Sequence, residues 1–187
     1  MGERPIPPRP GRTAMSARLA EILRVDHAGE LGAVHIYRGQ RAVFDAAAGH
    51  GQISGRLADV EAQEARHLAR FETLLSEHRV RPTLLAPLWR VAGFTLGAAT
   101  ALLGEKATHA CTEAVETVIE HHYAGQVAEL AERDPALAAE LTAFRGDELA
   151  HRDEAVSEGA HAAPGHGLLT AAIRAGCRAA IKISERV

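Results

Sequence analysis

Two short motifs, each a glutamate followed three residues later by a histidine, carry metal-binding chemistry. They are Glu64-x-x-His67 and Glu148-x-x-His151. Residues three apart lie on one face of a helix, so each motif would present a carboxylate and an imidazole side by side. Iron and manganese accept both kinds of donor. One such motif is common by chance in helical chains, whereas two with partner glutamates indicate a site.

The partner glutamates come from an internal repeat. Residues 28–40 match residues 114–126 at an offset of 86, with six of thirteen positions identical. Among the identical pairs are Glu30 with Glu116 and Tyr37 with Tyr123. The two Glu-x-x-His motifs are related by a similar offset of 84. We interpret the repeat as two related helix hairpins.

The expected turns put all four glutamates at one level. In an antiparallel hairpin, two residues at the same height lie equally far from the turn. The midpoint of Glu30 and Glu64 is residue 47, beside a glycine-rich turn at 49–51. The midpoint of Glu116 and Glu148 is residue 132, beside a predicted helix break. The four carboxylates should therefore meet inside one bundle.

Buried carboxylates without partners cost several kcal/mol each, and a pair of metal ions removes that cost by supplying positive charge. Ferritin-like di-iron bundles use this donor set, with one glutamate from each of two helices and Glu-x-x-His from the other two. The sequence therefore predicts an all-α, ferritin-like four-helix bundle made of two helix hairpins. Its predicted metal ligands are Glu30, Glu64, His67, Glu116, Glu148 and His151.

The choice of Glu116 needs the repeat, because Glu113 and Glu120 project near the same helix face. Hairpin spacing alone fits Glu113 equally well. Glu113 has Lys106 and His109 beside it, and we expect it to be more exposed to water.

Helix-forming residues and helix-ending prolines and glycines place the elements. We predict helices over residues 16–48, 54–79, 105–132, 135–161 and 168–184, with Asp134 capping the fourth. Residues 1–15 are proline-rich and are expected to be a disordered tail. The first helix contains Gly29, Gly32 and Gly39. We expect it to be continuous, with its small residues letting another segment approach closely.

The sequence allows two interpretations of the roles of several other polar residues. Asp26 could support the ligand carboxylates from one turn away. His27, His109, His121 and His122 either orient metal ligands or lie on solvated or packing faces. The two repeat tyrosines are either core residues with hydrogen-bonded hydroxyls or redox partners. The residues with open roles are Asp26, Tyr37, His121, His122 and Tyr123.

An apolar segment connects the two hairpins. Residues 82–104 contain one charged side chain, Arg90. Its helical part, residues 88–103, would be about 24 Å long at ~1.5 Å per residue, short of the ~30 Å of a bilayer core. The segment is either a crossover helix buried on the bundle or an element partly inserted in a membrane interface. Trp89, Phe94 and several leucines favour the membrane interface.

The last predicted helix supports the same interpretation. Arg174, Arg178 and Lys182 recur every four residues, opposite an apolar stripe that includes Leu169 and Ile173. A basic amphipathic helix is typical of a membrane-surface element, although a solvated face gives the same pattern.

Composition sets outer limits. A chain of 187 residues and 19.9 kDa suits one domain, here residues 16–187. The net charge of −3 argues against a general nucleic-acid binder. Two cysteines fit a reducing compartment, and no signal peptide is evident at the N-terminus.

The motifs together resemble the demethoxyubiquinone hydroxylases of ubiquinone biosynthesis, from about residue 16 to the C-terminus. The segments that carry the resemblance are residues 24–30, 87–89, 91–94, 100–104, 110–112, 114–116, 121–123 and 184–186.

The resemblance implies a peripheral membrane di-iron monooxygenase on the cytoplasmic side of the cell inner membrane. It would use O₂ to hydroxylate the ring of a polyprenylated methoxy-methyl-benzoquinol. One iron would be held by Glu30, Glu64 and His67, the other by Glu116, Glu148 and His151, with Glu64 and Glu148 bridging. Other proteins of ubiquinone biosynthesis or a second copy of the chain would be its partners.

Two other classes share parts of the pattern. A ferritin- or rubrerythrin-like ferroxidase or iron-binding protein would use the same ligands. A soluble iron-storage shell, however, has no use for the apolar segment bearing Trp89. The third hypothesis is a metal-free membrane scaffold.

Overall fold

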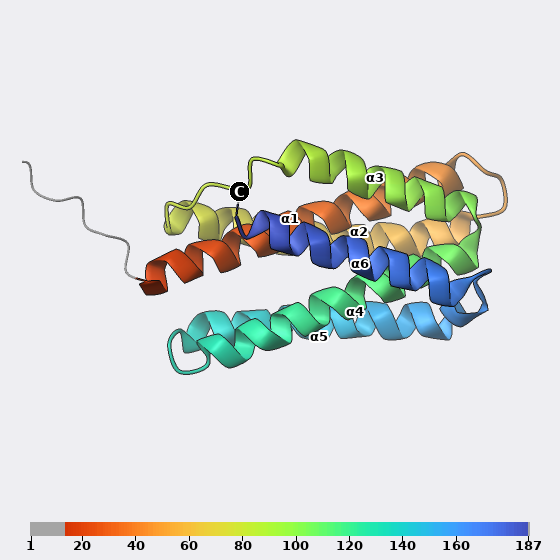
Figure 1. Cartoon of the computed structure of the whole chain (residues 1–187). Helices are drawn as coiled ribbons and strands as arrows, with labels where there is room; N and C mark the ends of the chain where they lie inside the picture. The colour runs from red at the N-terminus through yellow and green to blue at the C-terminus, as the bar shows by residue number, and fades with distance from the viewer. Residues whose placement is uncertain (1–13, 187) are drawn as a thin grey trace, which may run out of the picture.

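The computed structural model describes residues 14–186, which form α-helices, one short 3₁₀ helix and no strand (Figure 1). The α-helices are α1 (Ala14–Asp45), α2 (Gly51–Glu77), α3 (Ala86–Leu102), α4 (Glu105–Leu130), α5 (Pro135–Ser157) and α6 (His166–Ser184), with the 3₁₀ helix η1 (Ala160–Ala162) before α6. The predicted all-α class is confirmed.

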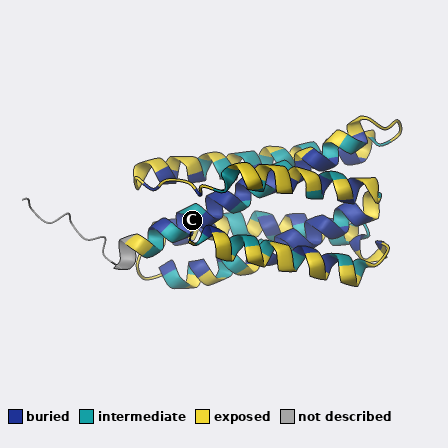
Figure 2. Ribbon diagram, turned by 45° about the horizontal axis from the view of Figure 1, so that its top comes forward, coloured by how far each residue is buried: buried dark blue, intermediate teal, exposed yellow. Residues whose placement is uncertain are grey.

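The two predicted hairpins form the bundle. α1 packs against α2, and α4 packs against α5. α3 lies along the outer side of α1, and α6 lies along α4 at the front of the view in Figure 1. The buried faces of these helices point inward, and exposed residues line the outer faces (Figure 2). One apolar cluster draws on all four bundle helices, with Leu23, Phe71, Tyr123 and Leu141 among its members.

The helix ends differ from prediction where local backbone chemistry intervenes. Asp134 caps α5 as expected, because its carboxylate accepts a hydrogen bond from the Leu137 N–H at 3.1 Å. α5 ends at Ser157 rather than near residue 161, because Gly159 adopts the left-handed conformation at φ 93°. Of the tail predicted over residues 1–15, residues 1–13 lie outside the described part, and the last two residues begin α1.

The glycines of α1 and α3 let the two helices approach closely. A Cβ built on Gly39 would lie 2.1 Å from the Phe94 carbonyl oxygen, and one on Gly97 would lie 1.9 Å from that of Ile36. No side chain fits at either position. The prediction that small residues in a continuous first helix permit a close approach is confirmed, and the approaching segment is α3.

We expect Gly39→Ala to destabilise the protein by about 1–3 kcal/mol, because the new methyl group forces α3 away from α1. Gly125, the repeat partner of Gly39, has open space around its Cβ position and provides a matched control. Gly125→Ala should raise stability by about 0.4–1 kcal/mol, because alanine limits the unfolded chain. Thermal unfolding of the two variants measures the contrast, and equal melting temperatures would contradict the close contact.

α3 also has an outward face that is apolar. Val91 is 65% exposed and Phe94 is 42% exposed, whereas Gly93 and Gly97 are buried against α1. Within the described residues, no helix combines the length and apolarity needed to cross a membrane. α3 therefore packs on the bundle with one face, and membrane contact by its other face stays a prediction.

Candidate metal centre

The structure brings all six predicted ligands together at the middle of the bundle. Each of the six is at least 94% buried. They form two clusters in which one donor atom per residue lies within 4.8 Å of the others. The first cluster is Glu30, Glu64, His67 and Glu148, and the second is Glu64, Glu116, Glu148 and His151.

Glu64 and Glu148 belong to both clusters and lie between the two histidines. His67 Nδ1 is 3.3 Å from Glu148 Oε1 and 3.7 Å from Glu30 Oε2. His151 Nδ1 is 3.1 Å from Glu64 Oε1 and 3.5 Å from Glu148 Oε2. The arrangement offers two neighbouring cation positions with two shared carboxylates.

Several buried polar atoms at this centre are available to bind a pair of metal ions. None of the inward-facing atoms named next has a hydrogen-bond partner among the described residues, although all are buried. They are Glu30 Oε2, Glu64 Oε1, His67 Nδ1, both carboxylate oxygens of Glu148, and His151 Nδ1. Buried groups of this kind are normally paired. Carboxylate oxygens and imidazole nitrogens turned toward one point fit two iron or manganese ions.

The outer nitrogen of each histidine is held from the opposite hairpin. His67 Nε2 lies 3.0 Å from Asp147 Oδ2, and His151 Nε2 lies 3.1 Å from Gln63 Oε1. Each acceptor directly precedes the ligand glutamate of its helix, at equivalent positions of the repeat. Such contacts fix the ring and leave Nδ1 free to bind a metal. Sequence reasoning missed both acceptors, and their signal is their place in the two motifs.

The two repeat tyrosines also cross between the hairpins. The Tyr37 hydroxyl donates to Glu116 Oε1 at 2.6 Å, and the Tyr123 hydroxyl donates to Glu30. Both tyrosines are buried. Each hydroxyl therefore orients the carboxylate of the other half of the repeat, as expected for core tyrosines with hydrogen-bonded hydroxyls.

Burial raises the pKa of Glu30 and Glu116 well above the ordinary carboxyl value, and neighbouring carboxylates add to the shift. Burial opposes protonation of the two imidazoles. Their contacts with Glu148 and a second carboxylate nevertheless raise the pKa of His67 to about 11 and of His151 to about 10. Burial likewise opposes ionisation of Glu148, but the two histidines lower its pKa to about 2. The metal-free centre thus keeps protons on both histidines.

The metal-free protein should therefore become less stable as the pH rises from 6.5 toward 10. In this range the two histidines of the folded protein still bind protons that the unfolded chain has released. The free energy of unfolding therefore falls as the pH rises. Metal binding requires deprotonated imidazoles, so metal-loaded protein should gain stability over the metal-free form as pH rises. Melting temperatures across this pH range, with and without Fe²⁺ under anaerobic conditions, measure both trends. A metal-free profile that rises with pH would contradict the assignment.

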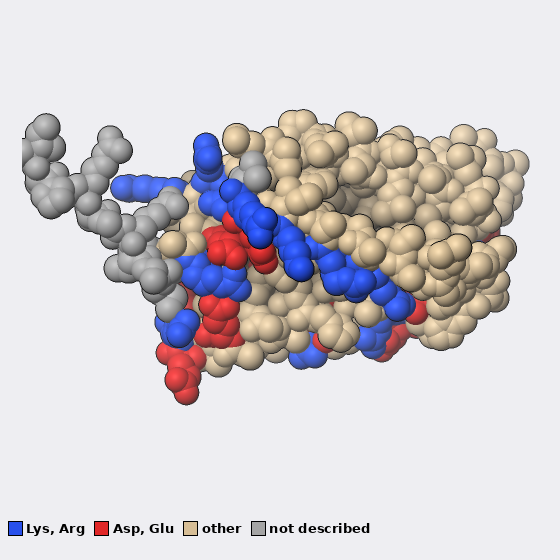
Figure 3. Space-filling view, viewed as in Figure 1, with Lys and Arg blue, Asp and Glu red and all other residues tan. Residues whose placement is uncertain are grey.

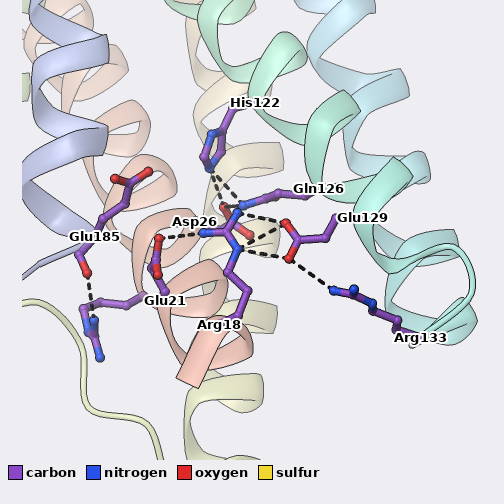
Figure 4. Close-up of polar contacts among 9 residues, drawn as sticks. Arg18, Glu21, Asp26, His122, Gln126, Glu129, Arg133 and Glu185 are labelled. Carbon is purple, nitrogen blue, oxygen red and sulfur yellow. Dashed lines mark hydrogen bonds and ion pairs between the residues drawn. The ribbon is translucent and has the colours of Figure 1, made fainter. Parts of the chain in front are cut away.

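Asp26 lies one turn from Glu30 and joins α1 to α4 (Figure 4). Its Oδ1 accepts a hydrogen bond from Gln126 Nε2 at 2.8 Å and lies 3.4 Å from His122 Nε2. Burial raises the pKa of Asp26. His121 is exposed and bonds to the Thr117 carbonyl oxygen. Asp26 and His122 therefore support the helix that carries Glu30, and His121 lies outside the centre.

The other candidate glutamates of α4 face different partners. Glu120 pairs with Arg145, and Glu116 alone of the three reaches the centre, as the repeat predicts. Glu113 is more exposed than Glu116, which is 1% exposed, as expected, but it is not open to water. Glu113 is only 7% exposed because the segment after α5 folds over it, where His166 contacts it.

An apolar cavity of about 580 Å³ lies between α1, α3, α4 and α6. Gly29 and Val115, which line it, directly precede Glu30 and Glu116. The predicted apolar stripe of the last helix, including Ile173, forms its wall on α6. Figure 3 shows the surface hollowed between α3 and α6. Two of the helices that carry ligands, α1 and α4, therefore also form walls of this cavity.

Four bundle helices that carry two Glu-x-x-His motifs and two further glutamates around one buried point define a ferritin-like carboxylate–histidine protein. The sequence profile of the family described as "Ubiquinone biosynthesis protein COQ7" matches residues 17–184. The chain therefore belongs to this family.

Its relatives include proteins named as hydroxylases. A 3-demethoxyubiquinol 3-hydroxylase of Rhodospirillum rubrum is 49% identical over 178 residues, covering 95% of this chain and 82% of that protein. The mitochondrial NADPH-dependent 3-demethoxyubiquinone 3-hydroxylase of Homo sapiens is 46% identical over 175 residues, covering 91% and 79%. The mitochondrial 5-demethoxyubiquinone hydroxylase of Saccharomyces cerevisiae is 40% identical over 189 residues, covering 93% and 80%.

Proposed function

We propose that this protein hydroxylates the ring of a polyprenylated demethoxyubiquinol in ubiquinone biosynthesis. The reaction would use O₂ and two iron ions held by the six buried side chains. The names of the family relatives support the activity. The observation that carries the proposal is the apolar cavity placed beside a buried carboxylate–histidine centre.

The ligands would divide as the symmetry of the repeat suggests. Glu30 and His67 would bind one iron, and Glu116 and His151 the other, while Glu64 and Glu148 would bridge them. When bound, the iron pair would supply the redox chemistry that inserts one oxygen atom of O₂ into the ring. The second oxygen atom would leave as water, with two protons and with two electrons from a reductant such as the nicotinamide named for the human relative.

The surrounding residues prepare the centre for this chemistry. Tyr37 and Tyr123 hold two ligand carboxylates in place, and Asp147 orients the His67 ring. Apolar walls exclude water from the site of oxidation. Trp89 lines the cavity, and its buried indole N–H has no hydrogen-bond partner among the described residues. This donor would bind an oxygen of the substrate ring.

The outer face would bind the membrane that dissolves the substrate. Arg174, Arg178 and Lys182 form a basic row along α6, next to a face of α3 on which Figure 3 shows no charged side chain. Exposed apolar side chains on α3 would enter the lipid interface while the basic row meets anionic headgroups. The protein would lie peripherally on the cytoplasmic side of the inner membrane. The quinol would then enter the cavity without crossing water.

Replacing Val91 and Phe94 together with serine should lower binding to anionic vesicles about tenfold or more, because two exposed apolar anchors are lost. Replacing Ala136 and Ala139 with serine adds the same groups to the exposed outer face of α5 and should leave binding unchanged. Co-sedimentation with vesicles measures both. Equal binding by the two variants would contradict contact through α3.

The proposed activity is tested by loading the protein with Fe²⁺ under anaerobic conditions. Vesicles containing a demethoxyubiquinol, a reductant and ¹⁸O₂ are then added, and the product is analysed by mass spectrometry. The proposal predicts one ¹⁸O atom per product ring. Oxidation of iron without ring hydroxylation would indicate a ferroxidase instead.

A further inference from the structure

We propose that Glu113, His161 and His166 form a second metal site, separate from the buried centre, that binds a zinc-like divalent transition metal. The three residues come from α4, η1 and the first turn of α6, respectively. Their donor atoms lie within 4.8 Å of one another. None of the three belongs to the buried clusters, so this site does not depend on the proposed function.

The donor types and distances suit zinc. Two imidazoles and a carboxylate are a common set of three protein ligands, with water in the fourth position. Metal bonds of 2.0–2.2 Å place tetrahedral donors about 3.3 Å apart. His161 Nε2 lies 3.6 Å from Glu113 Oε1, and His166 Nε2 lies 2.7 Å from Glu113 Oε2. If His166 Nε2 and Glu113 Oε2 moved apart by a few tenths of an ångström, the ion could bind between them.

The loop that carries His161 is already fixed in place. Lys106 Nζ donates to the Glu158 carbonyl oxygen at 2.6 Å, just before the left-handed Gly159. Ala160 and Ala163 pack on α4 and are buried. The His161 and His166 rings meet edge to face with centroids 4.9 Å apart. The ligands would therefore bind a metal without the cost of ordering a flexible loop.

The burial of the three ligands differs in a way that allows exchange with solvent. The Glu113 side chain is 9% exposed, whereas that of His161 is 64% exposed. A metal here would have water access at the open position and a buried anionic ligand beneath it. A water molecule in the fourth position is the usual arrangement where zinc has three protein ligands.

Arg174 is the group that competes with a metal. Its Nη2 lies 3.3 Å from Glu113 Oε1, so its guanidinium supplies the positive charge that the buried carboxylate needs. Arg174 also lines the groove between α4 and α6, next to Arg178 and Lys182. Metal binding would repel the guanidinium into this groove, so removal of Arg174 should tighten the site.

The site would fasten α6 to α4. Val115 and Leu169 both line the apolar cavity. Glu113 lies two residues before Val115, and His166 lies three residues before Leu169. A metal that joins Glu113 to His166 therefore restrains the cavity wall on α6 at its N-terminal end. Zinc would act there as a structural brace.

Equilibrium dialysis of the full chain against Zn²⁺ tests the proposal. The buried centre also has zinc ligands, so wild type should bind three equivalents and His161→Ala/His166→Ala should bind two. His121→Ala removes an exposed histidine of the groove between α4 and α6 and should retain three. Glu64→Ala/Glu148→Ala should lose the buried equivalents and retain one. Arg174→Ala should bind this last equivalent about fivefold more tightly, because a repelling charge is removed.

Zinc X-ray absorption of Glu64→Ala/Glu148→Ala identifies the ligands directly. The proposal predicts two imidazoles and one carboxylate around its single zinc ion. It is overturned if the double histidine variant binds as much zinc as wild type. It is also overturned if Glu64→Ala/Glu148→Ala, shown by circular dichroism to be folded, binds none. Loss of the buried equivalents alone would count against the proposed function and leave this site in place.

Discussion

Glu148→Ala is expected to lower quinol hydroxylation by more than about a hundredfold and to reduce bound iron, with helix content unchanged. Glu148 contacts both His67 and His151 and is shared by the two clusters. Its removal deprives both cation positions of a carboxylate. Both histidines also lose the nearby negative charge that favours their protonated form in the metal-free protein. Iron analysis and turnover measured on the same preparation check the expectation.

Glu120→Ala is the matched control for this loss. Glu120 is also a buried glutamate of the bundle, but it pairs with Arg145 and has no contact with the centre. We expect it to keep its iron and most of its turnover. Normal turnover in Glu148→Ala, or equal losses in the two variants, would remove Glu148 from the ligand set.

Gly32→Leu should lower kcat/KM for a long-tailed quinol about a hundredfold and leave the iron content unchanged. Gly32 lines the cavity, and a Cβ added to it meets no atom within 4 Å. A leucine side chain would therefore fill space that the substrate needs, without a clash in the helix. The bundle can accommodate the leucine side chain, but the cavity then has no room for the isoprenoid tail of the substrate.

Gly55→Leu controls for the change of residue type, because Gly55 is exposed on α2 and its Cβ position is also open. It should leave kcat/KM unchanged. A water-soluble quinol with no tail distinguishes an effect on substrate entry from an effect on the hydroxylation step. Gly32→Leu should lower kcat/KM for this quinol much less than for the long-tailed one. Equal activity of the two leucine variants toward the long-tailed quinol would place the substrate elsewhere.

The ligand positions could be predicted from the sequence because helical spacing and the repeat act together. Three-residue spacing fixes a shared helix face for Glu64 and His67. The hairpin midpoints fix the height of Glu30 and Glu116, and the structure places all of them at one centre. These inferences need only local geometry and the positions of turns.

Contacts between the hairpins could not be predicted in this way. The repeat identifies Tyr37 and Tyr123 as equivalent, but it does not show that each donates to the glutamate of the other half. The same holds for Asp147 and His67, whose contact depends on how α2 and α5 face each other. The extent to which Glu113 is buried could not be predicted, because its cover comes from a segment about fifty residues later in the chain.

The cavity is also a product of tertiary packing. Its walls come from four helices, and the close approach of α3 to α1 at Gly39 and Gly97 sets the position of one wall. The apolar stripes of α3 and α6 were visible in the sequence, but their amphipathic pattern did not distinguish a lipid-facing surface from a cavity lining. In the structure, α6 turns its stripe inward and α3 keeps part of its apolar surface outside.

The most direct measurement is anomalous X-ray diffraction at the iron edge from crystals of the protein loaded with Fe²⁺. We expect two peaks inside the bundle, one beside Glu30 and His67 and the other beside Glu116 and His151, with Glu64 and Glu148 between them. Iron peaks only at the surface, or none at all in protein that hydroxylates its quinol, would contradict this expectation.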